Sequence, residues 1–436
     1  MKILLVGNGG REHALAEKII KSPTFTTSDL TSDKRSILYS TTGNPGIDNI
    51  STALDINSND VNSLLEFALK EKIDLTIVGP EIPLSLGIAD EFQKKGLLIF
   101  GPTYRAAEIE TSKIFSKDLM KRSNIPTAEF MSFTSVDTNE IAKFLEVIGY
   151  PAVIKADGPA AGKGVIIAQN AEEAQEAIYE LSESKIFGES GAEFVIEKFL
   201  KGNEVSLFII TDGDDYILFP TAQDHKRIYD NDEGKNTGGM GAFSPASKFF
   251  TNEVKKKTED KIIRPILQAL KKENRKFKGC LYAGLIVDES GEPYVIEFNC
   301  RFGDPETQCV LELVEGDLPG LFKACAEGKL KEHQGIEFKK GFSACVVLSS
   351  GGYPDKYEID KVISGLDRID KDIKIFYSGV RNDNGVLKTN GGRVLSLVSY
   401  SEKSLRDAIE KVYENVSKVN FDGMHYRKDI GNKGIS

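Results

Sequence analysis

The stretch "EFNCRFGDPETQ", residues 297–308, directly follows the apolar run 294–296 and decides how this chain is interpreted. A buried strand that ends in so many charged and amide groups predicts a ligand at that end of its sheet. Glu297 and Asn299 lie two residues apart, so on a strand they face the same way. Both offer oxygen ligands, which suit Mg²⁺ or Mn²⁺ held between phosphate groups. The same stretch also carries Arg301, Asp304 and Glu306.

Composition limits the classes of protein that this chain can represent. Its 436 residues predict about three domains of roughly 150 residues each. The net charge of −10 argues against a nucleic-acid or membrane partner, and the longest apolar runs are far too short to span a bilayer. Five cysteines are scattered without a C-x-x-C pair, which argues against zinc or disulfides and predicts a cytoplasmic protein.

The first 112 residues are typical of a Rossmann-like α/β domain. The apolar strands "KILLVG", "RSILYS", "IDLTIVG" and "GLLIFG" alternate with the helical segments "REHALAEKII", "SNDVNSLLEFALKE" and "IADEFQKK". Three further units are expected after this domain. Residues 113–192 form a small unit with a Gly-rich loop, residues 193–327 a core, and residues 328–436 a small α+β domain. The fold class is therefore a multidomain combination of α/β and α+β.

The first glycine-rich turn, "VGNGGREHAL", leads from a strand into a helix and allows three interpretations. A helix start with free N–H groups can bind phosphate. A dinucleotide site would also need an acidic residue at the end of the second strand, whereas Asp29 and Asp33 precede that strand. A small phosphorylated substrate at Gly9, Gly10 and Arg11 is therefore favoured over NAD or a purely structural turn.

A second glycine-rich loop, "KADGPAAGKGV", begins at Lys155 and lacks the spacing of a Walker P-loop. Such a loop between two strands can cover phosphates above a fixed lysine, although a hairpin with solvated lysines fits equally well in isolation. The connector "VIEKFLKGNEVS" favours the nucleotide interpretation. It sets Phe199 and Leu200 between Glu197 and Glu204, so it could give an adenine apolar walls and a ribose a carboxylate.

Taken in order, these features resemble the ATP-grasp superfamily. The strings "GNGGREHAL", "IVGPE", "QDHKR", "NTGGMGA", "YAGL", "IEFNCRFGDPETQ" and "TNGGRV" further resemble the glycinamide ribonucleotide synthetase (phosphoribosylamine–glycine ligase) family and cover nearly the whole chain. The resemblance implies ligation of glycine to 5-phosphoribosylamine with ATP through glycyl phosphate, the second step of de novo purine (IMP) biosynthesis. No protein nucleophile is needed, because such chemistry requires metal, positive charge and positioning.

The resemblance also implies roles for individual residues. The ATP contacts expected are Lys113, Lys155, Gly158, Gly162, Lys163, Gly164, Glu197, Lys198, Phe199, Leu200 and Glu204. Mg²⁺ or Mn²⁺ is assigned to Glu297 and Asn299, and catalysis to Arg301 and Asp304. The substrates glycine and 5-phosphoribosylamine are assigned to Gly9, Gly10, Arg11, Asp224, Lys226, Arg227, Gly238 and Gly239.

The sequence departs from the family pattern at two positions, and several residues and the function itself allow alternative interpretations. Pro159 stiffens the loop that should close, and Leu285 stands where many ATP-grasp enzymes place another carboxylate. Arg301 and Asp304 could instead form a purely structural ion pair, and His13 and His225 are interpreted as structural. The competing functions are an NAD-dependent oxidoreductase, which leaves residues 155–308 unexplained, and a non-catalytic nucleotide-binding regulator, which would not need Glu297 and Asn299.

Overall fold

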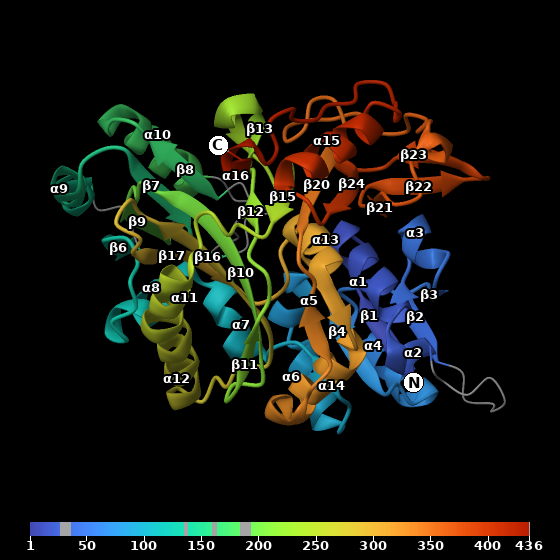
Figure 1. The fold of residues 1–436 in the computed structure, drawn as a ribbon. Coiled ribbons are helices and arrows are strands. Elements are labelled where there is room, and N and C mark those ends of the chain that lie inside the picture. Colours follow the sequence, from blue (N-terminus) through green and yellow to red (C-terminus); the bar gives the residue numbers. More distant parts are fainter. Residues whose placement is uncertain (27–35, 135–137, 159–163, 184–192, 436) are drawn as a thin grey trace.

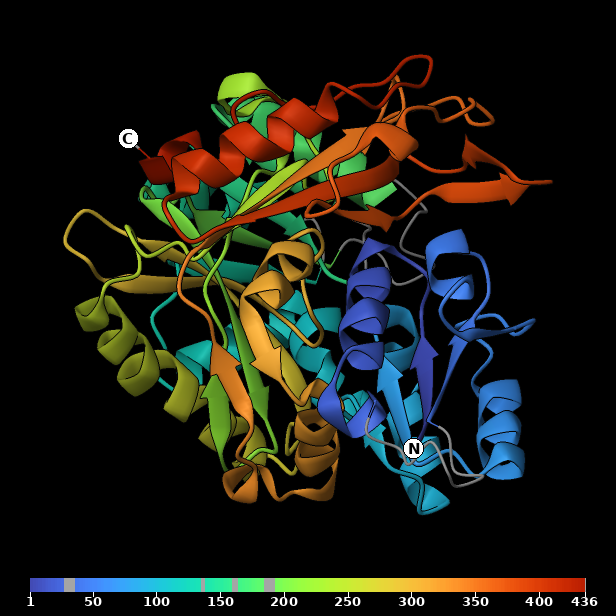
Figure 2. The same ribbon diagram turned by 45° about the vertical axis from the view of Figure 1, so that its right-hand side comes forward.

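The computed structural model of the protein describes residues 1–26, 36–134, 138–158, 164–183 and 193–435. Four principal sheets with their helices surround a central region (Figures 1 and 2). The C-terminal elements lie above the N-terminal sheet in Figure 1, and the small unit that carries β6 to β9 lies at the opposite side.

The N-terminal sheet is parallel, with strand order β3-β2-β1-β4-β5. Its strands are β1 (Lys2–Val6), β2 (Ile37–Thr41), β3 (Thr52–Leu54), β4 (Leu75–Val78) and β5 (Ile99–Phe100). Successive β1 residues pack into two different apolar clusters, because helices cover both faces: α1 (Gly10–Ile20) on one, α4 (Val61–Glu71) and α6 (Ile88–Lys94) on the other. The order reverses between β1 and β4, so the turns after these two strands flank the crevice where such sheets bind ligands.

The second sheet is antiparallel, with order β6-β9-β7-β8. Its strands are β6 (Phe130–Phe133), β7 (Ala152–Ala156), β8 (Val165–Ala168) and β9 (Phe194–Lys198). Helices α9 (Thr138–Ile148) and α10 (Ala171–Glu183) cover one face with an apolar cluster of their own. The sequence groups residues 194–198 with the core, but β9 hydrogen-bonds to β6 and β7 and so lies in this second sheet.

The core sheet has the order β11-β10-β16-β17. It comprises β10 (Asn203–Thr211), β11 (Tyr216–Leu218), β16 (Gly279–Val287) and β17 (Pro293–Asn299), and β16 and β17 form an antiparallel strand-turn-strand pair. Helices α11 (Asn252–Thr258) and α12 (Arg264–Lys272) contribute to the apolar cluster on one face. The opposite face carries Glu204, Tyr282 and Glu297 to the central cleft.

The C-terminal sheet has the order β12-β15-β20-β24-β21. Three of its strands lie in the predicted small α+β domain of residues 328–436: β20 (Phe342–Ser349), β21 (Lys374–Tyr377) and β24 (Arg393–Ser401), with helix α15 (Leu405–Val416) against them. The other two, β12 (Gln223–Asp224) and β15 (Gly241–Ser244), come from the middle of the chain. This long-range pairing brings the "QDHKR" segment against the C-terminal domain.

Shorter elements complete the fold. The remaining α-helices within the described residues are α2 (Pro23–Thr26), α3 (Pro45–Asp48), α5 (Glu81–Ser85), α7 (Tyr104–Thr111), α8 (Lys113–Arg122), α13 (Glu306–Val310), α14 (Leu318–Glu327) and α16 (Asn432–Ile435). The remaining strand pairs are β13 (Arg227–Tyr229) with β14 (Glu233–Asn236), β18 (Val314–Gly316) with β19 (Ile336–Phe338), and β22 (Val380–Asp383) with β23 (Val386–Thr389). Within the described residues, no helix has both the length and the apolar character needed to cross a membrane.

Candidate active site

A cleft of about 880 Å³ lies where the four sheets meet. A smaller pocket of about 200 Å³ adjoins it and shares Lys155, Glu197, Glu297, Asn299 and Arg301 with its lining. Because the same side chains line both, the two form one site. Residues from all four units therefore contribute to it.

Part of the cleft lining is an apolar slot. Val153 of β7 and Val165 and Ile167 of β8 contribute to it, together with Ile286 and Ile296 of the core sheet. The connector after β9 adds Lys198, Phe199 and Leu200 to the same lining, as expected from the sequence. The slot has the composition of a site for a flat, largely apolar ring with a few polar contacts at its rim.

Next to this slot lies a buried charge triad. Glu197 forms ion pairs with Lys155 at 2.9 Å and with Lys117 of α8 at 2.8 Å, and all three side chains are about 3–5% exposed. Burial lowers the pKa of Lys117 to about 8, although Glu197 opposes the shift. Burial would raise the pKa of Glu197, but the two lysines outweigh it and lower that pKa. Two ammonium groups on one carboxylate leave an excess positive charge beside the cleft.

A β-bulge aims Glu297 and Asn299 into the site. The register of β16 and β17 shifts so that Gly284 pairs with Glu297 while Leu285 pairs with Val295, which leaves Ile296 as the extra residue. Val295 stays in the core, whereas Ile296 and Glu297 both line the cleft. The Lys155 ammonium donates to the Ile296 carbonyl at 3.1 Å, so the bulge also joins the second sheet to the core.

The surroundings keep Glu297 ionised. Burial opposes its charge, but Lys226, Lys155 and Lys113 outweigh burial and hold the pKa of this carboxyl below its ordinary value. The Asn299 amide lies 3.5 Å from the Glu297 carboxylate. Among the described residues, no group of three or more His, Cys, Asp or Glu side chains could hold a metal by itself. The oxygen donors of this pair nevertheless fit a hard divalent cation whose other ligands come from phosphate and water.

Arg301 and Asp304 have separate partners rather than each other. Arg301 pairs with Glu110 at 3.0 Å and with Glu81 at 3.3 Å. Burial opposes the charge on Arg301, but these carboxylates outweigh it and raise the pKa. Asp304 pairs with Arg393 at 3.2 Å and accepts from Gln308 at 2.8 Å. Both residues line the cleft, and the structural pair considered from the sequence does not form.

Asp224 and Glu306 place two carboxyl groups at another part of the cleft. Burial, followed by the charge of Glu306, raises the pKa of Asp224 well above its ordinary value. Glu306 accepts from Ser206 at 3.1 Å, and Ser206 lies 2.9 Å from the Tyr282 hydroxyl. Two neighbouring carboxyl groups can receive an amine or ammonium group.

Cationic and backbone groups lie beside these carboxyls. Lys226 pairs with Glu204 at 3.2 Å, and Arg227 donates to the Gly234 carbonyl at 2.6 Å. The Gly238 amide donates to the Tyr353 hydroxyl at 2.9 Å. Lys226, Arg227, Gly238 and Glu204 all line the cleft, whereas Gly239 packs behind it with a positive φ of 111°. A Cβ on Gly239 would lie 2.4 Å from the Pro305 ring, so this backbone approach requires glycine.

At the N-terminal turn the Arg11 side chain, rather than free backbone N–H groups, faces the cleft. Glu12 accepts the Gly9 N–H at 2.7 Å and the Arg11 guanidinium at 2.6 Å, so a carboxylate already caps α1. Arg11 also donates to the Phe302 carbonyl at 2.9 Å, and among the described residues at this turn it is Arg11 that lines the cleft, not Gly9 or Gly10. A phosphate at this turn would therefore meet Arg11 first.

The Gly-rich loop lies only partly within the described residues. Gly158 and Gly164 line the smaller pocket, and Lys113 donates to the Gly158 carbonyl at 2.9 Å. Burial lowers the pKa of Lys113. Gly162 and Lys163, expected to contact ATP, and Pro159 lie outside the described residues.

The sequence patterns assigned no role to several residues that line or support the cleft. Lys117 follows Lys113 by one helical turn, and Glu12 has the Gly-x-x-Glu spacing of a capping residue, so both had a local signal. Glu81 and Arg393 lie in the strings "IVGPE" and "TNGGRV". Their proximity to Arg301 and Asp304 arises from pairing between distant elements.

Comparison with protein families matches almost the entire chain. Residues 1–110 match the N domain of phosphoribosylglycinamide synthetase, residues 111–307 its ATP-grasp (A) domain, and residues 343–433 its C domain.

Individual relatives agree with these matches. A phosphoribosylamine–glycine ligase from Halalkalibacterium halodurans is 44% identical over 436 residues, covering 100% of this chain and 98% of the relative. The crystal structure of a phosphoribosylamine–glycine ligase from Thermotoga maritima superposes with a TM-score of 0.81 at 31% identity, covering 99% of this chain and 100% of that one. The biotin carboxylase domain of a Hydrogenobacter thermophilus 2-oxoglutarate carboxylase, solved with MgADP, shares the fold with a TM-score of 0.71 at 16% identity, covering 97% of this chain and 91% of that one.

Proposed function

This chain belongs to the phosphoribosylglycinamide synthetase family, an ATP-grasp ligase of purine biosynthesis, and we propose how its cleft divides ATP, metal, glycine and 5-phosphoribosylamine. The observation that carries the proposal is a cleft whose lining combines apolar side chains, lysines and a pair of carboxyl groups. In this proposal residues 1–112 and 328–436 flank the substrates, while residues 113–192 and 193–327 enclose the nucleotide. A cytoplasmic location, inferred from the sequence, belongs to the same proposal.

The nucleotide occupies the apolar slot. The adenine lies between Val153 and Ile286, with the connector of Lys198, Phe199 and Leu200 along its edge. Glu204 is placed to accept the ribose hydroxyls. Its ion pair with Lys226, 3.2 Å away, holds the carboxylate in place. The phosphates then extend toward Lys155, beneath the loop that contains Gly158 and Gly164.

Mg²⁺ or Mn²⁺ is held by Glu297 and Asn299. The support for this assignment is the ionised carboxylate of Glu297 and the amide beside it, both aimed at the cleft by the bulge. When bound, such a cation neutralises charge on the phosphate oxygens and favours phosphoryl transfer. Lys155 and Lys113 add fixed positive charge on the same side of the site.

The substrates lie next to the nucleotide, because Lys226 is only 3.2 Å from Glu204. The carboxyl pair of Asp224 and Glu306 receives an amino group, and Arg11 with Lys226 or Arg227 receives the 5-phosphate of phosphoribosylamine. Arg301 is placed to neutralise charge on the transferred phosphoryl group, and its two carboxylate partners fix its orientation. Arg393 orients Asp304 in the same way.

The reaction needs no covalent attachment to the protein. A glycine carboxylate oxygen attacks the γ-phosphorus, the bond to the β-phosphate oxygen breaks, and ADP leaves. The nitrogen of 5-phosphoribosylamine then attacks the carbonyl carbon of glycyl phosphate, phosphate leaves, and the nitrogen loses a proton to give glycinamide ribonucleotide. Catalysis therefore comes from positioning and from charge placed where the phosphoryl group moves.

The test is a steady-state assay of ADP release with each substrate omitted in turn, together with mass identification of the product. We expect release that depends on glycine and 5-phosphoribosylamine, with one glycinamide ribonucleotide formed for each ADP. Release of ADP that ignores glycine, or nucleotide binding without turnover, would overturn the proposal.

A further inference from the structure

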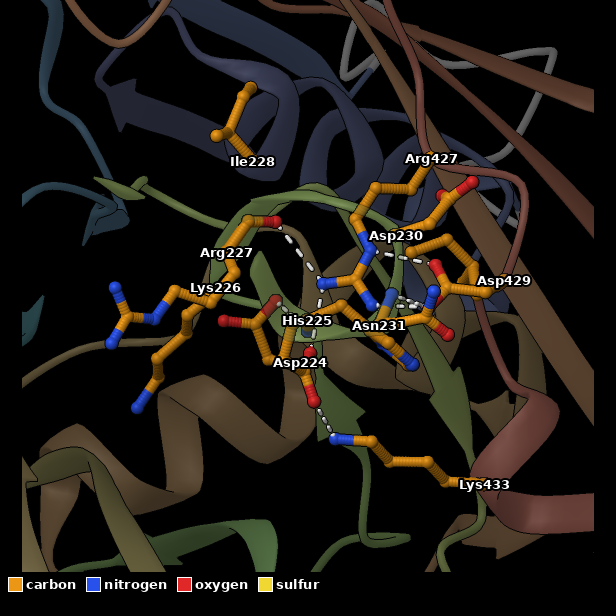
Figure 3. A network of polar contacts seen from close by, with 12 residues as sticks. Asp224, His225, Lys226, Arg227, Ile228, Asp230, Asn231, Arg427, Asp429 and Lys433 are labelled. Carbon is orange, nitrogen blue, oxygen red and sulfur yellow. Dashed lines mark hydrogen bonds and ion pairs between the residues drawn. The ribbon is translucent and has the colours of Figure 1, made fainter. Parts of the chain in front are cut away.

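A buried arginine near the C-terminus has no part in the site described so far. The side chain of Arg427 is 0% exposed, although it lies in the segment that joins α15 to α16. Its guanidinium binds Asp429 through two nitrogens at 2.8 and 2.7 Å. A third nitrogen donates to Asp232 at 2.9 Å and to the Arg227 carbonyl at 3.1 Å. Figure 3 shows this side chain directed into the curved segment that follows the "QDHKR" strand.

Further bonds join the same two segments, which are about 200 residues apart in the sequence. The Lys428 amide donates to Asp230 at 2.7 Å, and the Asn231 amide donates to Asp429 at 2.8 Å. The Gly431 amide donates to Nε2 of His225 at 3.2 Å. Residues 225–232 are therefore held by residues 425–433 along most of their length.

The held segment has little support of its own. Within the described residues β13 pairs only with β14, and an isolated two-stranded ribbon is marginally stable in water. Asn231 and Asp232 both have positive φ, at 58° and 56°, a conformation that needs support from its surroundings. The contacts from the C-terminal segment supply that support.

The same segment carries cleft residues at its other end. Asp224, Lys226 and Arg227 line the cleft, and the Arg227 carbonyl bound by Arg427 belongs to the residue directly after Lys226. We propose that Arg427 is a positioning residue, which sets the substrate-facing segment 224–227 and so determines affinity for 5-phosphoribosylamine. This inference rests on the proposed function, in which that segment faces the phosphorylated substrate.

Arg427 fits this role because of its fork of N–H groups. It binds two carboxylates and a carbonyl at once, a geometry that a lysine ammonium cannot reproduce. Burial would raise the pKa of Asp429, but the hydrogen bonds from Arg427 outweigh it and lower that pKa to about 2.

The test compares Arg427→Met and Arg427→Lys with Val412→Ala in the full-length protein. Val412 is a buried apolar residue of α15 in the same domain, so its truncation lowers stability without touching residues 225–232. For Arg427→Met we expect the KM for 5-phosphoribosylamine to rise about 10²-fold, because a small displacement of a binding group costs that order of magnitude. The KM for ATP should rise by a much smaller factor, since the displaced segment meets the proposed nucleotide contacts only through the Lys226–Glu204 pair. Arg427→Lys should fall between this variant and the wild type, and Val412→Ala should change the melting temperature alone.

The outcomes separate this inference from the proposed function. If the wild-type protein ligates glycine and both Arg427 variants show the wild-type ratio of the two KM values, Arg427 is only structural. An equal change in both KM values would also mean that Arg427 is only structural. If Arg427→Met does not fold, Arg427→Lys decides on the same ratio. A wild-type protein without glycine-dependent ADP release would overturn the proposed function, and this inference with it.

Discussion

Acidification from about pH 7 to about pH 5 should destabilise the protein in part through His225. This side chain is 1% exposed, and its Nε2 accepts the Gly431 amide while Nδ1 lies 3.3 Å from the Gly241 carbonyl, as expected for a neutral ring. Burial, and then the charges of Arg427 and Lys433, lower its pKa from 6.5 to about 4. Between these values the unfolded chain binds more protons than the folded chain, so stability is complete above 6.5 and is lost as the pH falls.

The expected loss of stability follows from the pH interval over which only the unfolded chain binds the proton. From 6.5 to about pH 5 is about 1.5 units, and at 1.36 kcal/mol per unit the loss is about 2 kcal/mol. His13 has a pKa lowered to about 4 by burial and should contribute similarly, so a variant is needed to isolate one histidine. Glutamine at position 225 offers an acceptor and a donor but does not titrate.

The measurement is urea unfolding followed by circular dichroism, because the chain contains no tryptophan. Wild type and His225→Gln are compared at both pH values, and the pH-dependent loss should be smaller in the variant by about 2 kcal/mol. His13→Gln serves as the matched control, because the ring of His13 also accepts a backbone amide, that of Tyr377, at 2.9 Å. An identical pH dependence in wild type and His225→Gln would refute the assignment of a neutral buried ring.

Three further predictions concern the cleft. Glu297→Gln and Asn299→Ala should each lower turnover by about 10²-fold or more, while nucleotide affinity falls much less. The reason is that a cation on the phosphates acts mainly on charge that develops during transfer. Near-normal turnover at saturating Mg²⁺ would remove the metal assignment. Lys155→Ala should raise the KM for ATP and lower kcat, since it deletes a fixed cation, and unchanged steady-state constants would contradict that role. Gly10→Asp should raise the KM for 5-phosphoribosylamine but leave the nucleotide affinity and the glycine KM unchanged, because its Cβ would lie 2.5 Å from the Ser378 hydroxyl and so displace the turn that carries Arg11. Loss of ATP affinity in the folded variant would reverse the assignment of nucleotide and substrate.

Much of the fold could be predicted because it follows local patterns. The apolar run "KILLVG" predicts a buried strand, and the amphipathic segment of α4 predicts a helix. The resemblance to the ATP-grasp superfamily is confirmed by the family matches and by the shared fold. The pairing of β12 and β15 with the C-terminal sheet could not be predicted, since strands of two and four residues carry no signal for a partner about 100 residues away.

In the site, too, features set by local sequence could be predicted and those set by distant elements could not. The two-residue spacing of Glu297 and Asn299 correctly predicts a shared face, but the bulge at Ile296 that turns this face away from Val295 has no sequence signature. The partners of Arg301 and Asp304 come from α5, α7 and β24, so the local sequence could not specify them. The individual ligand contacts remain predictions.

The central claim is that ATP activates the glycine carboxylate in this cleft, and oxygen transfer tests it most directly. Glycine labelled with ¹⁸O in its carboxylate is supplied with ATP, Mg²⁺ and 5-phosphoribosylamine, and the released phosphate is analysed by mass spectrometry. Because the carboxylate oxygen that attacks the γ-phosphorus leaves with the phosphate, each turnover should place one ¹⁸O atom in inorganic phosphate. Unlabelled phosphate formed alongside glycinamide ribonucleotide would contradict the account.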